Sequence, residues 1–108
     1  MHIEPKNAFE TLKHSSKPFA VMFEHGSLSV EMYKPIGVDL QQPHSRDEVY
    51  IIISGHGMFN NGGTQHPFAA GDFIFVAAGT EHRFETFSED FSTWVLFYGP
   101  EGGEHASN

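Results

Sequence analysis

The sequence contains no cysteine, which excludes disulfides and thiolate metal sites. Basic residues are also few: six Lys and Arg stand against fourteen Asp and Glu, for a net charge of -8. Because nucleic acid and anionic membranes need a basic surface, we expect neither as a partner. No apolar run approaches the roughly 20 residues of a membrane span. The N-terminus lacks the basic start and apolar segment of a signal peptide, so we expect a cytoplasmic protein.

The chain of 108 residues predicts one domain that is long enough to bury a core. We place this domain at residues 1–99 and expect the Gly-rich, polar residues 100–108 to form a flexible tail. Eleven phenylalanines and eleven glycines are typical of tightly turned strands around an aromatic core.

Short runs of β-branched and aromatic residues alternate with Gly, Pro and Asn turns along most of the chain. The predicted strands are 19–24, 28–33, 40–44, 48–53, 58–60, 64–67, 73–76, 82–87 and 93–98. One short helix is predicted at 7–14, with Asn7 as its N-cap and Glu10 at the capping-box spacing. Turns about ten residues apart predict an all-β sandwich or barrel.

Two polar clusters stand beside predicted strands: the segment 42–48 and His82. Gln42, His44 and Glu48 have the same parity, so in an extended chain they would face one side together with Tyr50. Burying such groups costs several kcal/mol per bare ion, on the order of 20 in the idealised limit, unless something compensates them. A divalent cation is the usual compensation, so these residues are candidate metal ligands.

The spacing around the first cluster resembles the first motif of the cupin superfamily, and of its small single-domain members in particular. That motif is Gly, five residues, His-x-His, three or four residues, Glu, six residues, Gly. His44, Glu48 and Gly55 stand in register with it, Gln42 replaces the first histidine, and Gly37 precedes Gln42 with four rather than five residues between them.

The second motif of that family is Gly, five residues, Pro-x-Gly, two residues, His, three residues, Asn. Gly71, Gly79 and His82 match it, whereas Ala77 replaces the proline and Thr86 the asparagine. The resemblance implies a double-stranded β-helix, or jelly-roll barrel, over about residues 19–99, with a small-molecule ligand or substrate in its cavity and a homodimer as the assembly.

The resemblance also implies the metal ligands His44, Glu48 and His82, with Gln42 as a weaker amide donor. Two histidines and a carboxylate form the facial set of non-haem iron(II) oxygenases, which leaves open positions for substrate and oxygen. The same set suits Mn, Ni, Co or Zn, so the divalent metal is not identified.

Two questions stay open at this point. A cupin fold without metal is the alternative, in which His44 and Glu48 pair with each other or with Arg46, and His82 is a satisfied core histidine. For function, a metal-dependent oxygenase, isomerase, cyclase or lyase stands against a non-enzymatic protein that binds a sugar or small metabolite. In the enzyme, Tyr50 is a candidate general acid or substrate anchor.

Overall fold

The computed structural model describes residues 1–105, which form one helix and eight strands. The helix is α1 (Pro5–Lys13). The strands are β1 (Phe19–His25), β2 (Leu28–Tyr33), β3 (Asp47–Ser54), β4 (His56–Asn61), β5 (Thr64–Ala69), β6 (Phe73–Val76), β7 (His82–Phe87) and β8 (Ser92–Tyr98). The predicted strand at 40–44 does not form, and these residues belong instead to the irregular loop between β2 and β3.

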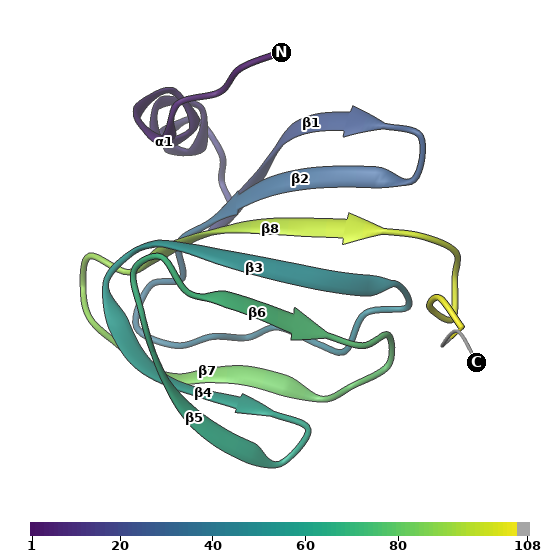
Figure 1. Ribbon diagram of the computed structural model, residues 1–108. Helices are drawn as coiled ribbons and strands as arrows, with labels where there is room; N and C mark the ends of the chain where they lie inside the picture. The colour runs from purple at the N-terminus through teal and green to yellow at the C-terminus, as the bar shows by residue number, and fades with distance from the viewer. Residues whose placement is uncertain (106–108) are drawn as a thin grey trace.

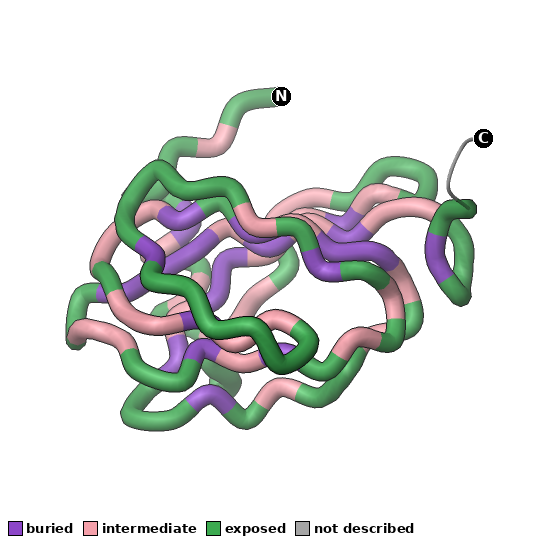
Figure 2. The backbone as a smooth tube through the Cα atoms, turned by 60° about the horizontal axis from the view of Figure 1, so that its bottom comes forward, coloured by how far each residue is buried: buried purple, intermediate pink, exposed green. Residues whose placement is uncertain are grey.

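The strands make two antiparallel sheets that face each other (Figure 1). The larger sheet has the order β1-β2-β8-β3-β6, and the smaller has the order β5-β4-β7. Buried stretches follow the strands, while most turns and the chain ends are exposed (Figure 2). The architecture is therefore the expected all-β jelly roll.

Strand β3 carries the alternation that places functional residues inside the barrel. Glu48, Tyr50 and Ile52 are all buried, whereas Ile51 between them is partly exposed on the opposite face of the sheet. The prediction that Glu48, Tyr50 and Ile52 share one face of this strand is therefore confirmed. Aromatic rings fill the space between the sheets, where Tyr50 packs edge-on against Phe84 at a centroid distance of 4.9 Å.

The chain passes from one sheet to the other at Gly55, between β3 and β4. Gly55 has a φ of +88°, which side chains rarely tolerate, and a Cβ here would lie 2.6 Å from the Cα of Phe91. The motif glycine is thus required both by the turn and by the close approach of the 88–91 segment.

Helix α1 begins earlier than predicted and packs beside β1 and β2 (Figure 1). Its N-cap residue is Glu4, whose side chain makes no capping hydrogen bond, and Pro5 occupies the first turn. The predicted N-cap residue, Asn7, lies inside the helix. Proline favours this position because its fixed φ suits a helix start and its missing N–H has no helical partner there. Among the described residues, no helix has the length and apolar character needed to cross a membrane.

The segment expected to be a flexible tail is partly bonded to the barrel. The backbone N–H of Gly102 donates to the carbonyl of Ser45 at 2.6 Å, and that of Glu104 donates to Asp47 Oδ2 at 2.9 Å. Gly103 between them is buried. Residues 100–105 are therefore docked beside the 45–47 segment, and the rest of the predicted tail, 106–108, lies outside the described residues.

Candidate metal centre

Three side chains that can bind a metal converge inside the barrel: His44, Glu48 and His82. One donor atom from each lies within 4.8 Å of the other two. Glu48 Oε1 is 3.1 Å from His82 Nε2, and Glu48 Oε2 is 4.0 Å from His44 Nε2. The side chains of Glu48 and His82 are 1% exposed, whereas that of His44 is 36% exposed. The cluster therefore has two buried members and one that lies nearer the solvent.

Glu48 and His82 come from opposite sheets. Glu48 lies in β3, where it pairs with Phe97 of β8 on one side and Val76 of β6 on the other. Such a central position holds the backbone of Glu48 firmly. His82 begins β7 and pairs with Asn61 of β4. The separation of the two side chains is therefore set by the packing of sheet on sheet.

His44 comes from the loop that precedes β3. Its carbonyl accepts a hydrogen bond from the N–H of Gly79 at 2.7 Å, which ties this loop to the turn before β7. Its ring meets Phe97 edge-on at a centroid distance of 4.7 Å. These two contacts orient the imidazole toward Glu48 although no regular strand supports it.

The orientation of the His82 ring follows from its contact with Thr80. His82 Nδ1 lies 2.9 Å from the Thr80 carbonyl, which can only accept, so Nδ1 carries a proton and Nε2 faces the cluster. Burial by itself lowers the pKa of His82, but the hydrogen bonds to Glu48 and to the Thr80 carbonyl outweigh it, so the pKa is raised. Without a metal, His82 therefore tends to hold a second proton toward Glu48.

The donor atoms of the cluster suit a metal ion. His44 Nε2 and Glu48 Oε2 are buried and, among the described residues, have no hydrogen-bond partner, while Glu48 Oε1 faces only His82 Nε2 at 3.1 Å. Buried polar atoms without partners are costly and uncommon in folded proteins. Imidazole and carboxylate donors at one point match the preferences of first-row divalent metals. The residues therefore fit the metal that the cupin motifs imply.

The loop places Gln41, rather than Gln42, toward this centre. Gln42 is exposed, so its expected inward orientation is not found. Gln41 Oε1 instead accepts a hydrogen bond from the Tyr50 hydroxyl at 2.9 Å. The parity argument assumed an extended strand at 40–44, and it fails because that strand does not form. No sequence signal separates the two neighbouring glutamines.

Tyr50 is close to the cluster but does not reach the solvent. It is 0% exposed, and its hydroxyl lies 3.0 Å from His82 Nε2. Burial and the nearby Glu48 carboxylate raise the pKa of Tyr50 well above its ordinary value, so the phenol keeps its proton. Its position suits an effect on His82 better than contact with a substrate.

A cavity of about 480 Å³ opens beside His44. It is lined by both polar and apolar side chains, and its size is within the range of small-molecule sites. Its polar wall includes Gln41, Arg46 and Glu31, and burial followed by the Glu48 carboxylate raises the pKa of Glu31. Arg46 lies over the Phe97 ring at 5.9 Å and donates to the Ser27 carbonyl.

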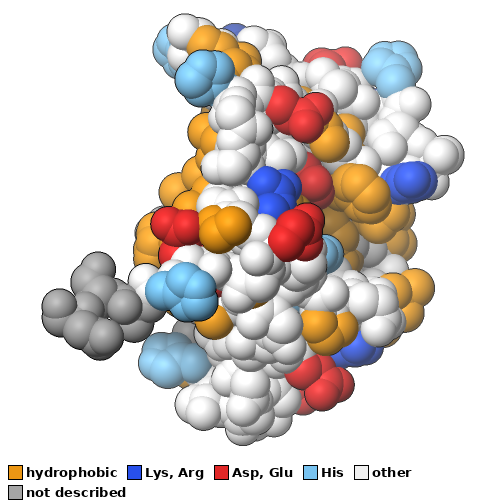
Figure 3. Space-filling model, turned by 90° about the vertical axis from the view of Figure 1, so that its right-hand side faces the viewer, with side chains coloured by type: hydrophobic (Ala, Val, Ile, Leu, Met, Phe, Trp, Pro, Cys, Tyr) orange, Lys and Arg blue, Asp and Glu red, His pale blue; other side chains and the backbone are white. Residues whose placement is uncertain are grey.

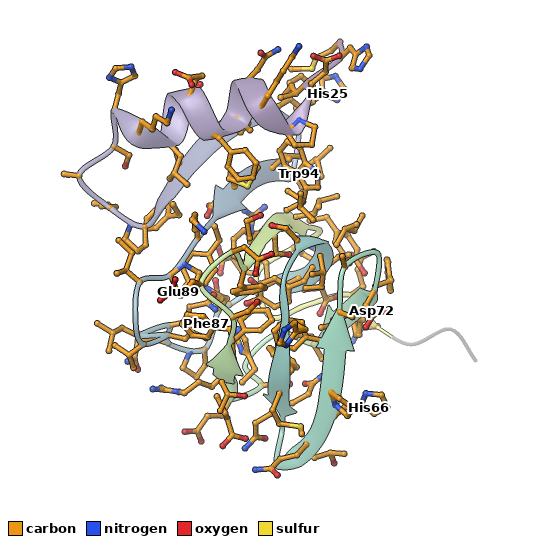
Figure 4. The ribbon with its side chains drawn as sticks, turned by 90° about the vertical axis from the view of Figure 1, so that its left-hand side faces the viewer. His25, His66, Asp72, Phe87, Glu89 and Trp94 are labelled. Carbon is orange, nitrogen blue, oxygen red and sulfur yellow. The ribbon has the colours of Figure 1, made fainter. Side chains whose placement is uncertain are left out.

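The histidines outside the motifs lie on the surface. His25, at the end of β1, and His66, on β5, are exposed and lie far from each other in Figure 4. On the face shown in Figure 3, acidic and basic side chains are interspersed and form no continuous basic patch.

Comparison with known families identifies the class of this protein. The Cupin domain family matches residues 29–98, which is more than half of the chain and includes both motifs and all three clustered side chains. The chain belongs to the cupin family.

Curated relatives match over part of their length. A protein of Streptomyces coelicolor described as uncharacterised is 40% identical over 63 residues, which cover 58% of this chain and 60% of that protein. An acireductone dioxygenase of Synechococcus is 38% identical over 55% of this chain and 35% of its own length. An oxalate-binding protein of Thermotoga maritima is 33% identical over 59% of this chain and 54% of its own. The chain thus spans between about a third and three fifths of these relatives.

Solved structures support the fold. A protein of Neisseria meningitidis superposes with a TM-score of 0.71 and 19% identity, over 92% of this chain and all of that one. A cupin-2 domain protein of Shewanella frigidimarina superposes with a TM-score of 0.69 and 18% identity, over 90% of this chain and 94% of that one. At this level of identity the likeness concerns the fold alone.

Proposed function

We propose that this protein binds one divalent metal ion through His44, Glu48 and His82 and uses it to hold a small organic molecule in the adjoining cavity. The observation that carries this proposal is the convergence of three donor side chains, among which buried His44 Nε2 and Glu48 Oε2 have no hydrogen-bond partner in the described residues. The bound ion would supply Lewis acidity and an attachment point for a ligand oxygen.

The residues of the chain have separate parts in this proposal. Glu48 and His82 form the buried side of the centre, where their positions are set by two packed sheets. His44 both donates to the metal and lines the cavity, so a ligand would approach the ion past its ring. Phe97, which also lines the cavity, would exclude water from one side of the ligand.

The function we favour is a metal-dependent enzyme of the oxygenase, isomerase, cyclase or lyase type. Three protein donors leave coordination positions open, which is the arrangement of catalytic rather than purely structural metal sites. The similarity to an acireductone dioxygenase over 55% of this chain is consistent with this proposal.

A non-enzymatic binding protein is the second candidate, and the oxalate-binding relative favours it. In that case the same centre would hold a small molecule without converting it. The cavity wall carries two acidic side chains, Glu31 and Glu101, and one basic side chain, Arg46. This charge balance does not favour a dianion such as oxalate. We therefore rank this candidate second.

Metal analysis tests the proposal directly. Protein purified without chelator, and then offered Fe(II), Mn, Ni, Co or Zn in turn, should retain about one equivalent of at least one metal. Retention below about a tenth of an equivalent with every metal contradicts the proposal. Turnover of candidate substrates by the metal-loaded protein then separates an enzyme from a binding protein, since only the enzyme changes the substrate.

The expected homodimer remains a prediction with one supporting feature. Strand β6 is at the edge of the larger sheet, and its Phe73 and Phe75 are 67% and 44% exposed. Edge strands with exposed aromatic residues favour pairing with another chain. Light scattering after gel filtration should give twice the chain mass for the native protein, and Phe73→Asp should shift it toward a monomer. A native monomer at all concentrations contradicts the prediction.

A further inference from the structure

We propose that Gln41 is a positioning residue for the metal centre, because it draws the Tyr50 hydroxyl proton away from His82 Nε2 and so leaves that nitrogen free for a metal. The inference rests on the proposed metal site, and it concerns a residue at a variable position of the first motif.

The Tyr50 hydroxyl lies between two competing acceptors. Its oxygen is 2.9 Å from Gln41 Oε1 and 3.0 Å from His82 Nε2. A phenol has one proton to donate. The Thr80 carbonyl holds a proton on His82 Nδ1, so once Nε2 has lost its own proton, which metal binding also requires, its lone pair would accept the Tyr50 proton. Only one of the two acceptors can receive it.

Asp39 decides which end of the Gln41 amide faces Tyr50. Gln41 Nε2 donates to Asp39 Oδ2 at 3.1 Å, and the Gln41 backbone N–H donates to Asp39 Oδ1 at 3.1 Å. An ionised carboxylate only accepts, so the amide NH₂ must point to Asp39 and the amide oxygen must point to Tyr50. That oxygen can only accept, which directs the Tyr50 proton toward Gln41.

Asp39, which orients the Gln41 amide, is itself firmly held. Asp39 is 1% exposed, and its carboxylate also accepts hydrogen bonds from the Tyr33 hydroxyl at 2.5 Å and from the backbone N–H of Phe84 at 2.9 Å. The chain of contacts therefore runs from a buried carboxylate through Gln41 and Tyr50 to His82. The donor and acceptor roles at Asp39 and Gln41 follow from chemistry, and only the Tyr50 proton has a choice, between Gln41 and His82.

Loss of the Gln41 oxygen should turn the Tyr50 proton onto His82 Nε2. A metal would then have to break that hydrogen bond before it could bind. Mutation of residues that form hydrogen bonds with metal ligands typically lowers metal affinity by 10- to 100-fold. We therefore expect Gln41→Leu to weaken metal binding by about tenfold.

The experiment measures Zn(II) affinity by competition with a chromophoric chelator for four variants and the native protein. Gln41→Leu should bind about tenfold more weakly. Gln42→Leu, the matched change at the exposed neighbour, should bind like the native protein. Tyr50→Phe, which removes the competing proton, should bind at least as tightly as native. Gln41→Leu combined with Tyr50→Phe should recover the affinity of Tyr50→Phe alone.

Recovery in the double variant is the decisive result, because a merely structural role of Gln41 would not be corrected by removing a hydroxyl group. The proposal is overturned if Gln41→Leu binds normally, or if the double variant stays as weak as Gln41→Leu. If Gln41→Leu does not fold, Tyr50→Phe decides alone, since weaker binding by it would mean that the hydroxyl supports the metal. Failure of the native protein to bind Zn(II) or any other metal offered would instead contradict the proposed function.

Discussion

Glu48 Oε1 lies 3.1 Å from His82 Nε2, although the two residues belong to strands of opposite sheets, β3 and β7. Both side chains are almost fully buried. An isolated carboxylate would be expensive in this setting, so the contact needs either a proton on His82 or a metal ion between the two groups. This relationship underlies the first three predictions.

His82→Ala should abolish metal binding, because it removes one of the two buried donors. Metal content after reconstitution and gel filtration measures the effect. His66→Ala is the matched control, since His66 is exposed on β5 and should retain full metal content. Gln42→Ala should also behave like the native protein because Gln42 is exposed. Retention of a full equivalent by His82→Ala would mean that the metal lies elsewhere.

Bound metal should stabilise the fold, because the converged donors exist only in the native state. Metal at about 100 times its dissociation constant raises the free energy of unfolding by about 2.7 kcal/mol. Thermal unfolding with and without metal measures this gain as a higher Tm. Glu48→Gln replaces the charged donor by a weaker amide, so its gain should be much smaller. An equal gain in Glu48→Gln would show that the stabilising ion does not bind at Glu48.

The stability of the protein should respond to pH in opposite directions with and without metal. The raised pKa of His82 means that its protonated form is favoured in the metal-free fold. That stabilisation is complete below the unfolded pKa of about 6.5 and is lost as pH rises through the folded value. A metal requires the unprotonated Nε2, so binding strengthens as pH rises.

The gain in Tm on adding metal should therefore increase between about pH 5.5 and 8. Calorimetry across this range measures Tm against pH both with and without metal. A metal-induced gain that stays constant over the range would contradict the assignment of His82 as the ligand that loses a proton. The metal-free His82→Ala protein should lack the corresponding fall in stability.

Gly103→Ala should destabilise the protein more than Gly102→Ala, because only Gly103 is closely packed. The two glycines have φ values of +90° and +87°, so both substitutions carry similar backbone strain, on the order of 1–3 kcal/mol. A Cβ at Gly103 would also lie 2.9 Å from Asp47 Oδ1, whereas one at Gly102 would have no described residue other than its chain neighbours within 4 Å. Urea unfolding should show an additional loss of about 1–3 kcal/mol for Gly103→Ala. Equal losses would mean that the 100–105 segment is not docked in solution.

Much of the local structure could be predicted from short-range patterns. The bounds of β2, β6 and β7 match the predicted ranges, because turn residues mark both ends of each apolar run. The buried face of β3 also follows from alternation alone. The predictions failed where residues lack such patterns: the 40–44 segment forms no strand, and α1 begins at Pro5 rather than after Asn7.

The sequence by itself determined the residue types and spacings of the candidate site: two histidines and a glutamate within two cupin motifs. Only the tertiary structure decided that their donor atoms meet, that Gln41 rather than Gln42 turns inward, and that residues 100–105 return to the barrel. The reason is physical. Alternation and turn preferences act over a few residues, whereas these three outcomes depend on contacts between segments that are far apart in the chain. Asp39, for example, which accepts from Gln41, is itself held by hydrogen bonds from Tyr33 of the larger sheet and Phe84 of the smaller one.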